Sequence, residues 1–336
     1  MSAGSPGAAA PVFSARPYES GQQARWDDLV ARSRNGTFLL KRGYLEYHAD
    51  RFVDASLTVW RGKKLVGVFP ASRHGDEVVS HGGLTYGGLL LDPKTSGRGT
   101  LGAFAAVCLA LRGAGASTLR VKPVPPIYHR MPAEDELYAI HRLGGALIRR
   151  DLASALRPAR PGPRSKGRAA MVKAAARRGN IAVRESDDFA AFMAMEASLL
   201  ADKYDVAPTH TAAELALLVE RFPKNIRLFI ATVDGELAAG TVIYATAQAA
   251  HAQYIASTPE GRACGALDTL HQHVIFTEFA DKPWFDFGIS TEEQGWVLNE
   301  GLCSSKESWG ARGVVYDQYR LDLSDARIDA VAGGLR

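Results

Sequence analysis

The stretch LFIATVDGELAAGTVIY, residues 228–244, consists of an apolar run, a short turn containing glycine and a second apolar run. Residues 57–70, LTVWRGKKLVGVFP, have the same arrangement, and an offset of 173 residues places Gly62 on Gly235 and Gly67 on Gly240. Apolar runs that flank a glycine turn predict a β-hairpin. Because an internal repeat decides the architecture of a chain, two such hairpins predict a duplicated unit.

The same elements are predicted to follow each hairpin. They are a strand (85–91 and 250–257), a helix (101–112 and 262–280) and a further strand (118–123 and 284–290). Two helices precede the second hairpin, and the later one begins with Thr211 and Glu214 in the spacing of a capping box. The order predicts an α+β fold with mixed sheets, in two similar domains.

The domain boundaries follow from this repeat and from composition. We expect a disordered tail at 1–14, a first domain at 15–150, a basic connecting segment at 151–180, a second domain at 181–323 and a tail at 324–336.

Bulk composition is that of a globular chain. Of 336 residues, 46% are hydrophobic and 23% charged. The three cysteines are far apart and odd in number, which favours a reducing compartment. The first residues lack the basic and apolar regions of a signal peptide, and the longest apolar run, 101–111, is about half of the ~20 residues that span a bilayer. We therefore expect a cytoplasmic protein without a transmembrane segment.

The strand predicted at 284–290 ends among polar residues, where ligands bind in open α/β sheets. Asp286 alternates with Phe285 and Phe287, so its side chain is expected on the opposite face, as a candidate general base. Ser290, Glu292 and Asn299 follow it, although Ser290 and Asn299 equally suit a turn-capping role.

Two further candidates lie earlier in the second half. His210 directly precedes the capped helix, whose N-terminus favours a neutral imidazole that can act as a base. Tyr254 lies on the strand at 250–257 and is a candidate for contact with substrate, although strand tyrosines often only pack.

Four stretches carry a resemblance to a known family. They are RSKGRAAMVKAAARRGNIAV (164–183), YIASTPEGRACGALDTL (254–270), FDFGIS (285–290) and the segment from Asn299 to Gly310. The second half resembles the GNAT acyltransferases, and the tandem arrangement, over residues 20–323, resembles their FemAB-like branch. The resemblance implies acyl transfer to an amine in two tandem GNAT-like domains.

The resemblance also implies a donor site. GNAT enzymes hold the pyrophosphate of coenzyme A with backbone N–H groups at a helix start, in the motif Arg/Gln-x-x-Gly-x-Gly/Ala. Arg262, Gly265 and Ala266 lie in the matching segment, but Leu267 stands where the motif has Gly or Ala. FemAB-like relatives, which take their acyl group from aminoacyl-tRNA, lack this loop in its full form.

Further roles are implied by position. Lys306 precedes a Trp-Gly pair as the lysine of FemAB-like proteins does, where it stabilises charge near the acyl group; an ion pair with Glu300 or Glu307 is the alternative. In the first domain the candidates for acceptor binding are Tyr86, Lys122, Tyr128 and His129. Glycines and prolines near them also suit simple turns.

Charge is concentrated in one segment. The net charge is +4, yet residues 157–178 contain eight basic and no acidic residues. This segment suits a solvated helix face, an anionic membrane, or the phosphates of coenzyme A or tRNA, with Arg164, Arg168, Lys173 and Arg177 as the tRNA contacts.

The function expected from sequence is N-acyl transfer, with acetyl-CoA as donor and an amine of a small molecule or a cell-envelope or polysaccharide precursor as acceptor. The alternative donor is aminoacyl-tRNA, and a non-catalytic module that docks on RNA or membrane is the third hypothesis. His271 and His273 are two residues apart and face different sides of a helix, so no metal site is expected. No permanently bound cofactor is predicted. The sequence does not predict the oligomeric state.

Overall fold

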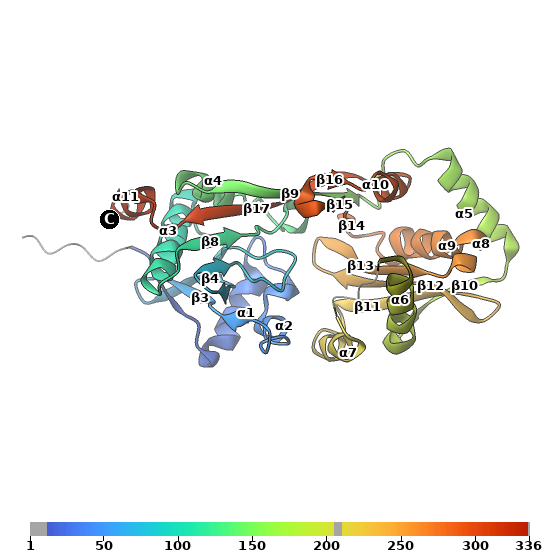
Figure 1. Ribbon diagram of the computed structural model, residues 1–336, viewed down its shortest axis with the longest axis horizontal. Helices are drawn as coiled ribbons and strands as arrows, with labels where there is room; N and C mark the ends of the chain where they lie inside the picture. The colour runs from blue at the N-terminus through green and yellow to red at the C-terminus, as the bar shows by residue number, and fades with distance from the viewer. Residues whose placement is uncertain (1–11, 205–209, 335–336) are drawn as a thin grey trace, which may run out of the picture. The chain divides into compact units, whose positions relative to one another are not determined.

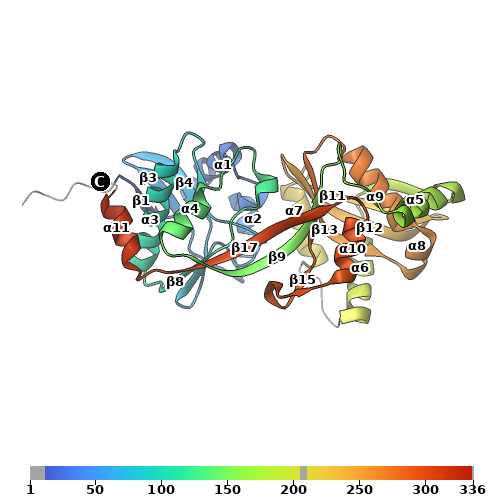
Figure 2. The ribbon, with the colours of Figure 1, turned by 90° about the horizontal axis from the view of Figure 1, so that it is seen from above.

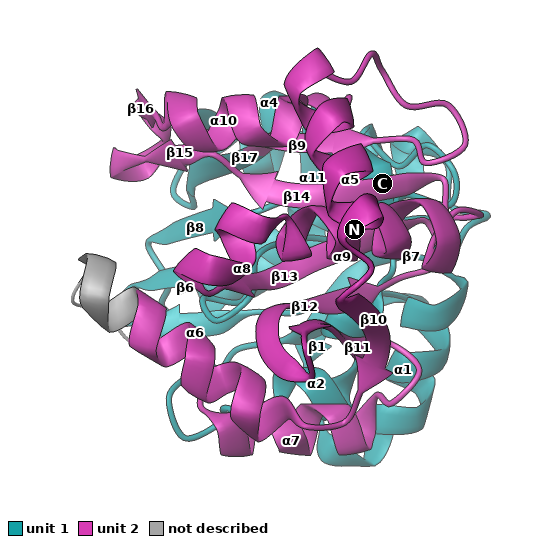
Figure 3. Ribbon diagram, turned by 90° about the vertical axis from the view of Figure 1, so that its right-hand side faces the viewer, with its two compact units in different colours: residues 1–149, 317–336 teal, residues 150–316 magenta. Residues whose placement is uncertain are grey.

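The computed structural model describes residues 12–204 and 210–334 (Figure 1). The chain forms two compact units, unit 1 from residues 1–149 with 317–336 and unit 2 from 150–316 (Figure 3). It passes from unit 1 to unit 2 within strand β9 (Ala146–Leu156) and returns within β17 (Arg312–Asp322), two long strands that are visible in Figure 2.

Unit 1 contains short strands around one long helix. Its strands are β1 (Ser14–Pro17), β2 (Val53–Asp54), β3 (Leu57–Arg61), β4 (Lys64–Phe69), β5 (Ser72–His74), β6 (Glu77–Val79), β7 (Leu90–Leu91) and β8 (Thr118–Val121). Its α-helices are α1 (Gln23–Arg32), α2 (Arg42–Leu45), α3 (Gly97–Gly113), α4 (Asp135–Arg142) and α11 (Ala326–Gly334).

The strands of unit 1 belong to two sheets. One has the order β1-β3-β4-β7 and is antiparallel throughout. In the other, the end of β17 pairs with β8, and β8 is followed by β6, β5 and β2. The β6–β8 pair is parallel, whereas the β17–β8, β5–β6 and β2–β5 pairs are antiparallel.

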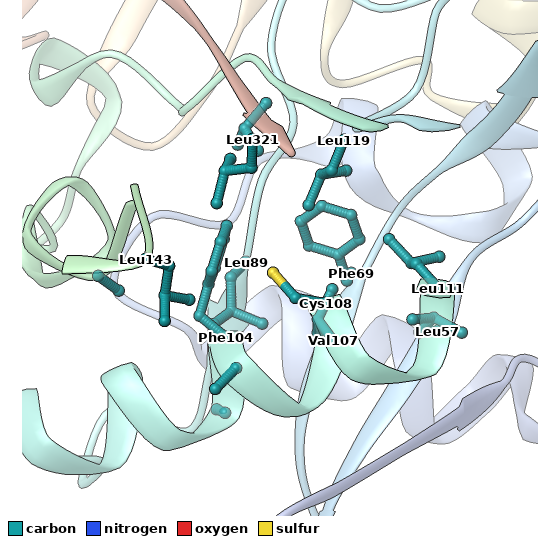
Figure 4. Packing of buried hydrophobic residues seen from close by; sticks show 14 of the residues in the cluster. Leu57, Phe69, Leu89, Phe104, Val107, Cys108, Leu111, Leu119, Leu143 and Leu321 are labelled. Carbon is teal, nitrogen blue, oxygen red and sulfur yellow. The ribbon is translucent and has the colours of Figure 1, made fainter. Parts of the chain in front are cut away.

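The core of unit 1 is built on α3. Phe104, Val107 and Cys108 are fully buried on this helix and lie beside Phe69 and Leu119 (Figure 4). Small residues such as Gly102 and Ala103 fill other positions of α3, which lets the helix pack closely on its surroundings.

Unit 2 has longer strands. They are β10 (Ile181–Ser186), β11 (Ile226–Val233), β12 (Glu236–Ala245), β13 (Ala249–Ser257), β14 (Trp284–Ile289), β15 (Thr291–Glu292) and β16 (Val297–Leu298). Its α-helices are α5 (Lys166–Arg178), α6 (Phe189–Tyr204), α7 (Ala212–Arg221), α8 (Pro259–Cys264), α9 (Ala266–His273) and α10 (Glu300–Glu307).

The main sheet of unit 2 has the order β10-β11-β12-β13-β14-β9. All of its strand pairs are antiparallel except β13–β14, which is parallel. Phe285 and Phe287 of β14 pack with Leu270 and Val274 in the core on the α9 side. The predicted capping box of α7 is confirmed, since Thr211 and Glu214 bond reciprocally.

The two predicted hairpins form, and their registers correct the predicted offset. Each hairpin has a β-bulge. In the first hairpin Val59 pairs with Gly67 and Trp60 with Leu65, which leaves Val66 as the bulge residue. In the second hairpin Ala238 is the bulge residue at the corresponding position of β12. These equivalent residues are 172 apart, not 173. Aligning the two hairpins on their turn glycines gives the wrong offset, because Gly62 is the first residue of its turn whereas Gly235 is the second residue of its turn.

Three other expectations changed. The strand expected at 85–91 is reduced to β7, since Gly87 and Gly88 interrupt it and Gly88 has a φ of +88°. The helix expected at 262–280 is divided at Gly265, whose φ is +84°. Residues 326–334, within the expected tail, form α11, because buried Ile328 packs into the unit 1 core.

The described residues also include part of the expected N-terminal tail and the basic segment. Of the tail expected at 1–14, residues 1–11 lie outside the described residues and Ser14 begins β1. The expected connecting segment at 151–180 contains the end of β9 and the whole of α5.

Candidate functional site

Strands β13 and β14 of unit 2 lie side by side over three residue pairs, the last of which is His251 with Asp286. On its other edge β14 pairs with β9 from Phe285 to Ile289, and beyond Asp286 only this pairing continues, whereas β13 continues along β12 to Ser257. Within the described residues, no strand therefore pairs with the β14-facing edge of β13 from Ala252 onward. The opening starts at His251 and Asp286.

Asp286 is a buried carboxylate at this opening. Its side chain is fully shielded from solvent and faces away from Phe285 and Phe287, as the alternation predicts. Oδ2 accepts hydrogen bonds from Nδ1 of His251 at 2.7 Å and from the hydroxyl of Tyr316 at 2.5 Å. Oδ1 accepts one from the backbone N–H of Gly288 at 2.8 Å. These donors make an ionised carboxylate tolerable in the interior.

His251 is the group of this network that solvent can reach. Its side chain is 15% exposed. A neutral imidazole that donates from Nδ1 to a carboxylate has its lone pair on Nε2. Gly288 leaves room for this ring, since a Cβ there would lie 3.2 Å from Cε1 of His251. The arrangement gives an oriented imidazole with a free basic nitrogen, the arrangement that proton transfer requires.

Lys306 holds the end of β14. Its ammonium, on α10, donates to the carbonyl oxygens of Gly288 at 2.9 Å and Ile289 at 2.5 Å. Burial lowers the pKa of Lys306 to about 8, although the charge of Asp286 acts in the opposite direction. The described contacts are with carbonyls and not with Glu300 or Glu307, so the alternative of an ion pair is replaced by a backbone clamp.

The three polar candidates after β14, Ser290, Glu292 and Asn299, differ in burial and in their hydrogen bonds. Ser290 is buried, and its hydroxyl has no hydrogen-bond partner among the described residues. Asn299 caps α10 by accepting from the N–H of Leu302 at 3.0 Å, and its amide donates to exposed Glu292 at 2.8 Å. The polar groups of Asn299 are thus engaged within the loop, as the capping alternative predicts.

The structure brings together two residues that the sequence suggested separately. Nδ1 of His210 lies 2.5 Å from the hydroxyl of Tyr254, and both side chains are buried. Tyr254 lies on β13, three residues beyond His251 and on the stretch that β14 does not cover. This pair provides a second proton-bearing group on the same strand.

The segment that resembles a pyrophosphate-binding loop is closed. Thr258 accepts from the N–H of Gly261 at 3.0 Å, and the N–H of Gly265 donates to the carbonyl of Arg262. A Cβ on Gly265 would lie 2.8 Å from the Cβ of Ala175, because α5 lies over this turn.

Charge in this segment does not favour an anion either. Glu260 lies in the first turn of α8 and Asp268 in the first turn of α9, beside Ala266. The guanidinium of Arg262 donates to the carbonyl of Ser257 at 3.1 Å.

The basic segment 157–178, which contains α5, has an inner and an outer set of cations. Arg164 lies 4.0 Å from the ring centre of Phe276 and donates to Gln272, and Arg168 forms an ion pair with Asp268. Both attach α5 to the rest of unit 2. Lys173 and Arg177, in contrast, are exposed.

Of the four acceptor-binding candidates in unit 1, Tyr86 and Tyr128 lie side by side. Tyr86 and Tyr128 are buried with ring centres 4.9 Å apart. Lys122 is buried, donates to the carbonyls of Gly82 and Leu84, and has its pKa lowered to about 7 by burial. Nε2 of His129 is 2.8 Å from the carbonyl of Val124.

Two residues of the site were not predicted from sequence, His251 and Tyr316. The signal for His251 is the register of β13 and β14, which places it opposite Asp286. Residues far apart in the chain supply the network, so no local motif contains them.

Within the described ranges, no group of three or more His, Cys, Asp or Glu side chains could hold a metal ion. The same part of the chain has no helix that is both long and apolar enough to cross a membrane.

A family model described as "Acetyltransferase (GNAT) domain" matches residues 164–294. The matched region lies in unit 2 and contains β10 to β14 with His251 and Asp286. Unit 2 accordingly contains a GNAT acyltransferase domain. A comparison with curated protein sequences gives no match.

Solved structures share the fold of the whole chain. FemX is similar with a TM-score of 0.66 and 11% identity, over 95% of this chain and 99% of that one. A conserved protein of unknown function from Bacteroides thetaiotaomicron has a TM-score of 0.56 and 11% identity, over 93% and 99%.

The C-terminal domain of a putative lysylphosphatidylglycerol synthetase from Agrobacterium fabrum has a TM-score of 0.53 and 10% identity, over 80% and 85%. At such identities the likeness concerns the fold alone. The fold is that of tandem, FemAB-like GNAT proteins.

Proposed function

We propose that unit 2 transfers an acyl group to an amine with His251 as the general base. The observation that carries this proposal is the 2.7 Å contact between His251 and buried Asp286 at the point where β13 and β14 separate. In this proposal Asp286 fixes the tautomer of His251 and stabilises the imidazolium that forms, instead of accepting the substrate proton itself.

The reaction proceeds by attack of the amine nitrogen on the acyl carbonyl carbon. The N–H proton passes to Nε2 of His251 as the new C–N bond forms. The bond from the carbonyl carbon to the leaving oxygen or sulfur then breaks, and the leaving atom takes the proton from the imidazolium. Backbone N–H groups on the free edge of β13 are the donors that we assign to the oxyanion.

Lys306 acts on this reaction through the backbone. Its ammonium binds the carbonyls of Gly288 and Ile289 and so holds the turn whose N–H group binds Asp286. We therefore assign Lys306 as a positioning residue. We assign the His210–Tyr254 pair as a candidate second acid. We assign no step of the reaction to Ser290 or Glu292.

The donor that the geometry favours is an aminoacyl ester of tRNA. The N–H groups of Gly261, Arg262 and Gly265 are engaged within the segment, and the carboxylates of Glu260 and Asp268 lie in the first turns of α8 and α9, where a diphosphate would need positive charge. The exposed cations of α5 offer a phosphate-binding face instead. Because Arg164 and Arg168 are engaged internally, the tRNA contacts that we propose are Lys166, Lys173, Arg177 and Arg178.

Acetyl-CoA is the second candidate donor, favoured by the acetyltransferase family model that matches unit 2. The acceptor that we propose in either case is an amine of a small molecule or of a cell-envelope or polysaccharide precursor. The name lysylphosphatidylglycerol synthetase denotes a lysyl group joined to a membrane lipid, which supports a search among cell-envelope acceptors.

The test compares donors. The protein is incubated with a panel of primary amines and with either mixed aminoacyl-tRNA or acetyl-CoA, and loss of the donor is followed. We expect amine-dependent turnover with aminoacyl-tRNA, which His251→Gln lowers by about 10²- to 10⁴-fold. The matched control is His141→Gln, at an exposed histidine of unit 1. Turnover with acetyl-CoA alone would overturn the donor, and full activity of His251→Gln would overturn the base.

A further inference from the structure

Helix α6 of unit 2 has a carboxylate on its buried face. The buried positions, Phe189, Phe192, Met193 and Glu196, follow the i, i+3, i+4, i+7 spacing of an apolar helix stripe. A hydrophobic side chain is expected at the last of these positions, yet Glu196 occupies it and is only 8% exposed. Glutamate is almost never buried to this extent unless another group pairs with it. The position therefore calls for a partner.

The protein itself supplies no such partner among the described residues. No hydrogen bond or ion pair joins the carboxylate of Glu196 to any of them. One turn away on α6, the neighbouring side chains are those of Phe192, Met193 and Leu199, which are all apolar. Burial raises the pKa of Glu196 to about 7, so the ionised form is costly in the unliganded protein. A cationic ligand would offset this cost.

Helix α6 packs on β13, on the face of the sheet that carries the proposed base. A Cβ on Gly240 of β12 would lie 2.5 Å from the ring of Phe192, so Gly240 faces α6. The residues two and four positions further along β12 share this face, and they pair with Tyr254 and His251 of β13. Side chains that pair across neighbouring strands lie on one face. Glu196, His251 and Tyr254 are thus on the same side of the sheet.

Glu196 is near the stretch of β13 that β14 leaves uncovered. The residue of β13 that pairs with Gly240 is Ala256, about 7 Å beyond Tyr254 along that stretch. Glu196 is one helix turn, about 6 Å, beyond the part of α6 that contacts Gly240. His251 lies on the other side of Tyr254, about 10 Å before it. A ligand that reaches from the imidazole to this carboxylate therefore needs an extended chain.

We propose that Glu196 binds a second, protonated amino group of the acceptor, so that the acceptor is an extended diamine. The inference rests on the reaction proposed for unit 2 and adds the class of amine. The amino group that attacks is the neutral one presented to His251, because its lone pair forms the new C–N bond. The other amino group keeps its proton and pairs with Glu196. A charge-assisted pair is stronger than a neutral hydrogen bond, so it selects diamines over monoamines of equal length.

The test is calorimetric titration of the full-length protein with the α,ω-diamines from 1,4-diaminobutane to 1,8-diaminooctane, each compared with the monoamine of equal chain length. We expect the preferred diamine to bind at least about tenfold more tightly than its monoamine, as one hydrogen-bonded charge allows. Glu196→Gln should reduce this preference to about twofold or less. The matched control is Glu220→Gln, which removes an exposed carboxylate from neighbouring α7 and should retain the preference.

A second variant separates binding from folding. Glu196→Leu completes the apolar stripe, so its thermal unfolding midpoint should equal or exceed that of the parent protein, while its preference for the diamine is lost. A lower midpoint would reveal a structural partner of the carboxylate and contradict the proposal.

Turnover distinguishes this inference from the reaction on which it rests. With either donor, Glu196→Gln should raise the KM for the diamine at least about tenfold, with a smaller change in kcat. If no amine supports turnover, the proposed reaction fails, whereas the titration still decides the role of Glu196. The inference is overturned if the parent protein has no preference for any diamine, if the preference persists in Glu196→Gln, or if Glu220→Gln loses it equally.

Discussion

Units 1 and 2 contain the same hairpin with a bulge at the same place, yet they differ at the two positions where chemistry could occur. Val66 and Ala238 occupy the equivalent bulges. In each unit a strand and then a helix follow, and Ser96 of unit 1 and Thr258 of unit 2 cap the helix by accepting from a glycine N–H. The backbone plan is common to both.

The first difference is the helix start. In unit 1, α3 begins with Gly97, Arg98 and Gly99, and its first turn has no acidic residue. In unit 2, α8 begins with Pro259, which has no N–H group, and Glu260. The first turn of α8 thus carries an acidic side chain of its own, and the first turn of α3 does not.

The second difference is the strand end. Lys122 follows β8 of unit 1 and is held by two carbonyl oxygens. On β14 of unit 2 the corresponding region has Asp286, which orients His251. The comparison teaches that the duplicated backbone provides equivalent positions, while the side chains at the strand and helix ends differ between the two units.

The largest expected effect tests whether each unit has its own core. Phe104→Ala in unit 1 and Leu270→Ala in unit 2 each remove a fully buried side chain and should lower the free energy of unfolding by about 2–5 kcal/mol. Hydrogen exchange should show the loss of protection mainly in the unit that carries the change. Equal loss in both units would contradict separate cores, and Met131→Ala, at an exposed side chain, is the control.

The next effect concerns the buried lysine of unit 2. Because the pKa of Lys306 falls to about 8 in the folded protein from 10.5, the unfolded chain binds more protons between these values, and stability should rise with pH in that window. The gain attributable to Lys306 is on the order of 2–3 kcal/mol. Denaturant unfolding of Lys306→Met from pH 7.5 to 10.5 should lack this rise relative to the parent, whereas Lys224→Met should retain it.

The smallest effect compares the two helix caps. Ser96→Ala and Thr258→Ala should each cost about 1 kcal/mol of stability, since each removes the acceptor for a first-turn N–H group. Asparagine at either position keeps a capping oxygen and should restore most of the loss in thermal unfolding. If asparagine is as harmful as alanine, the caps are not equivalent in the way the comparison requires.

Much of this fold was predictable from local patterns. The hairpins, the capping box at Thr211 and the orientation of Asp286 follow from apolar alternation and helix-start signals, which depend on neighbouring residues. The offset of the repeat was wrong by one residue because Gly62 and Gly235 serve different positions of their turns.

The site was less predictable because its contacts are nonlocal. His251 acquires its role from a parallel register with a strand 35 residues later, and Tyr316 reaches Asp286 from β17. Lys306 lies beside two glutamates in sequence but bonds carbonyl oxygens in space. Such partners become apparent only when the strands and helices are placed together.

The central claim, that Asp286 acts through His251, is tested most directly by a double-mutant cycle in the transfer reaction. Initial rates are measured for His251→Gln, Asp286→Asn and the double variant, with folding checked by circular dichroism. Our account predicts that the double variant is no slower than His251→Gln alone, since the carboxylate has no role once the imidazole is lost. Losses that multiply in the double variant would show independent roles and contradict the account.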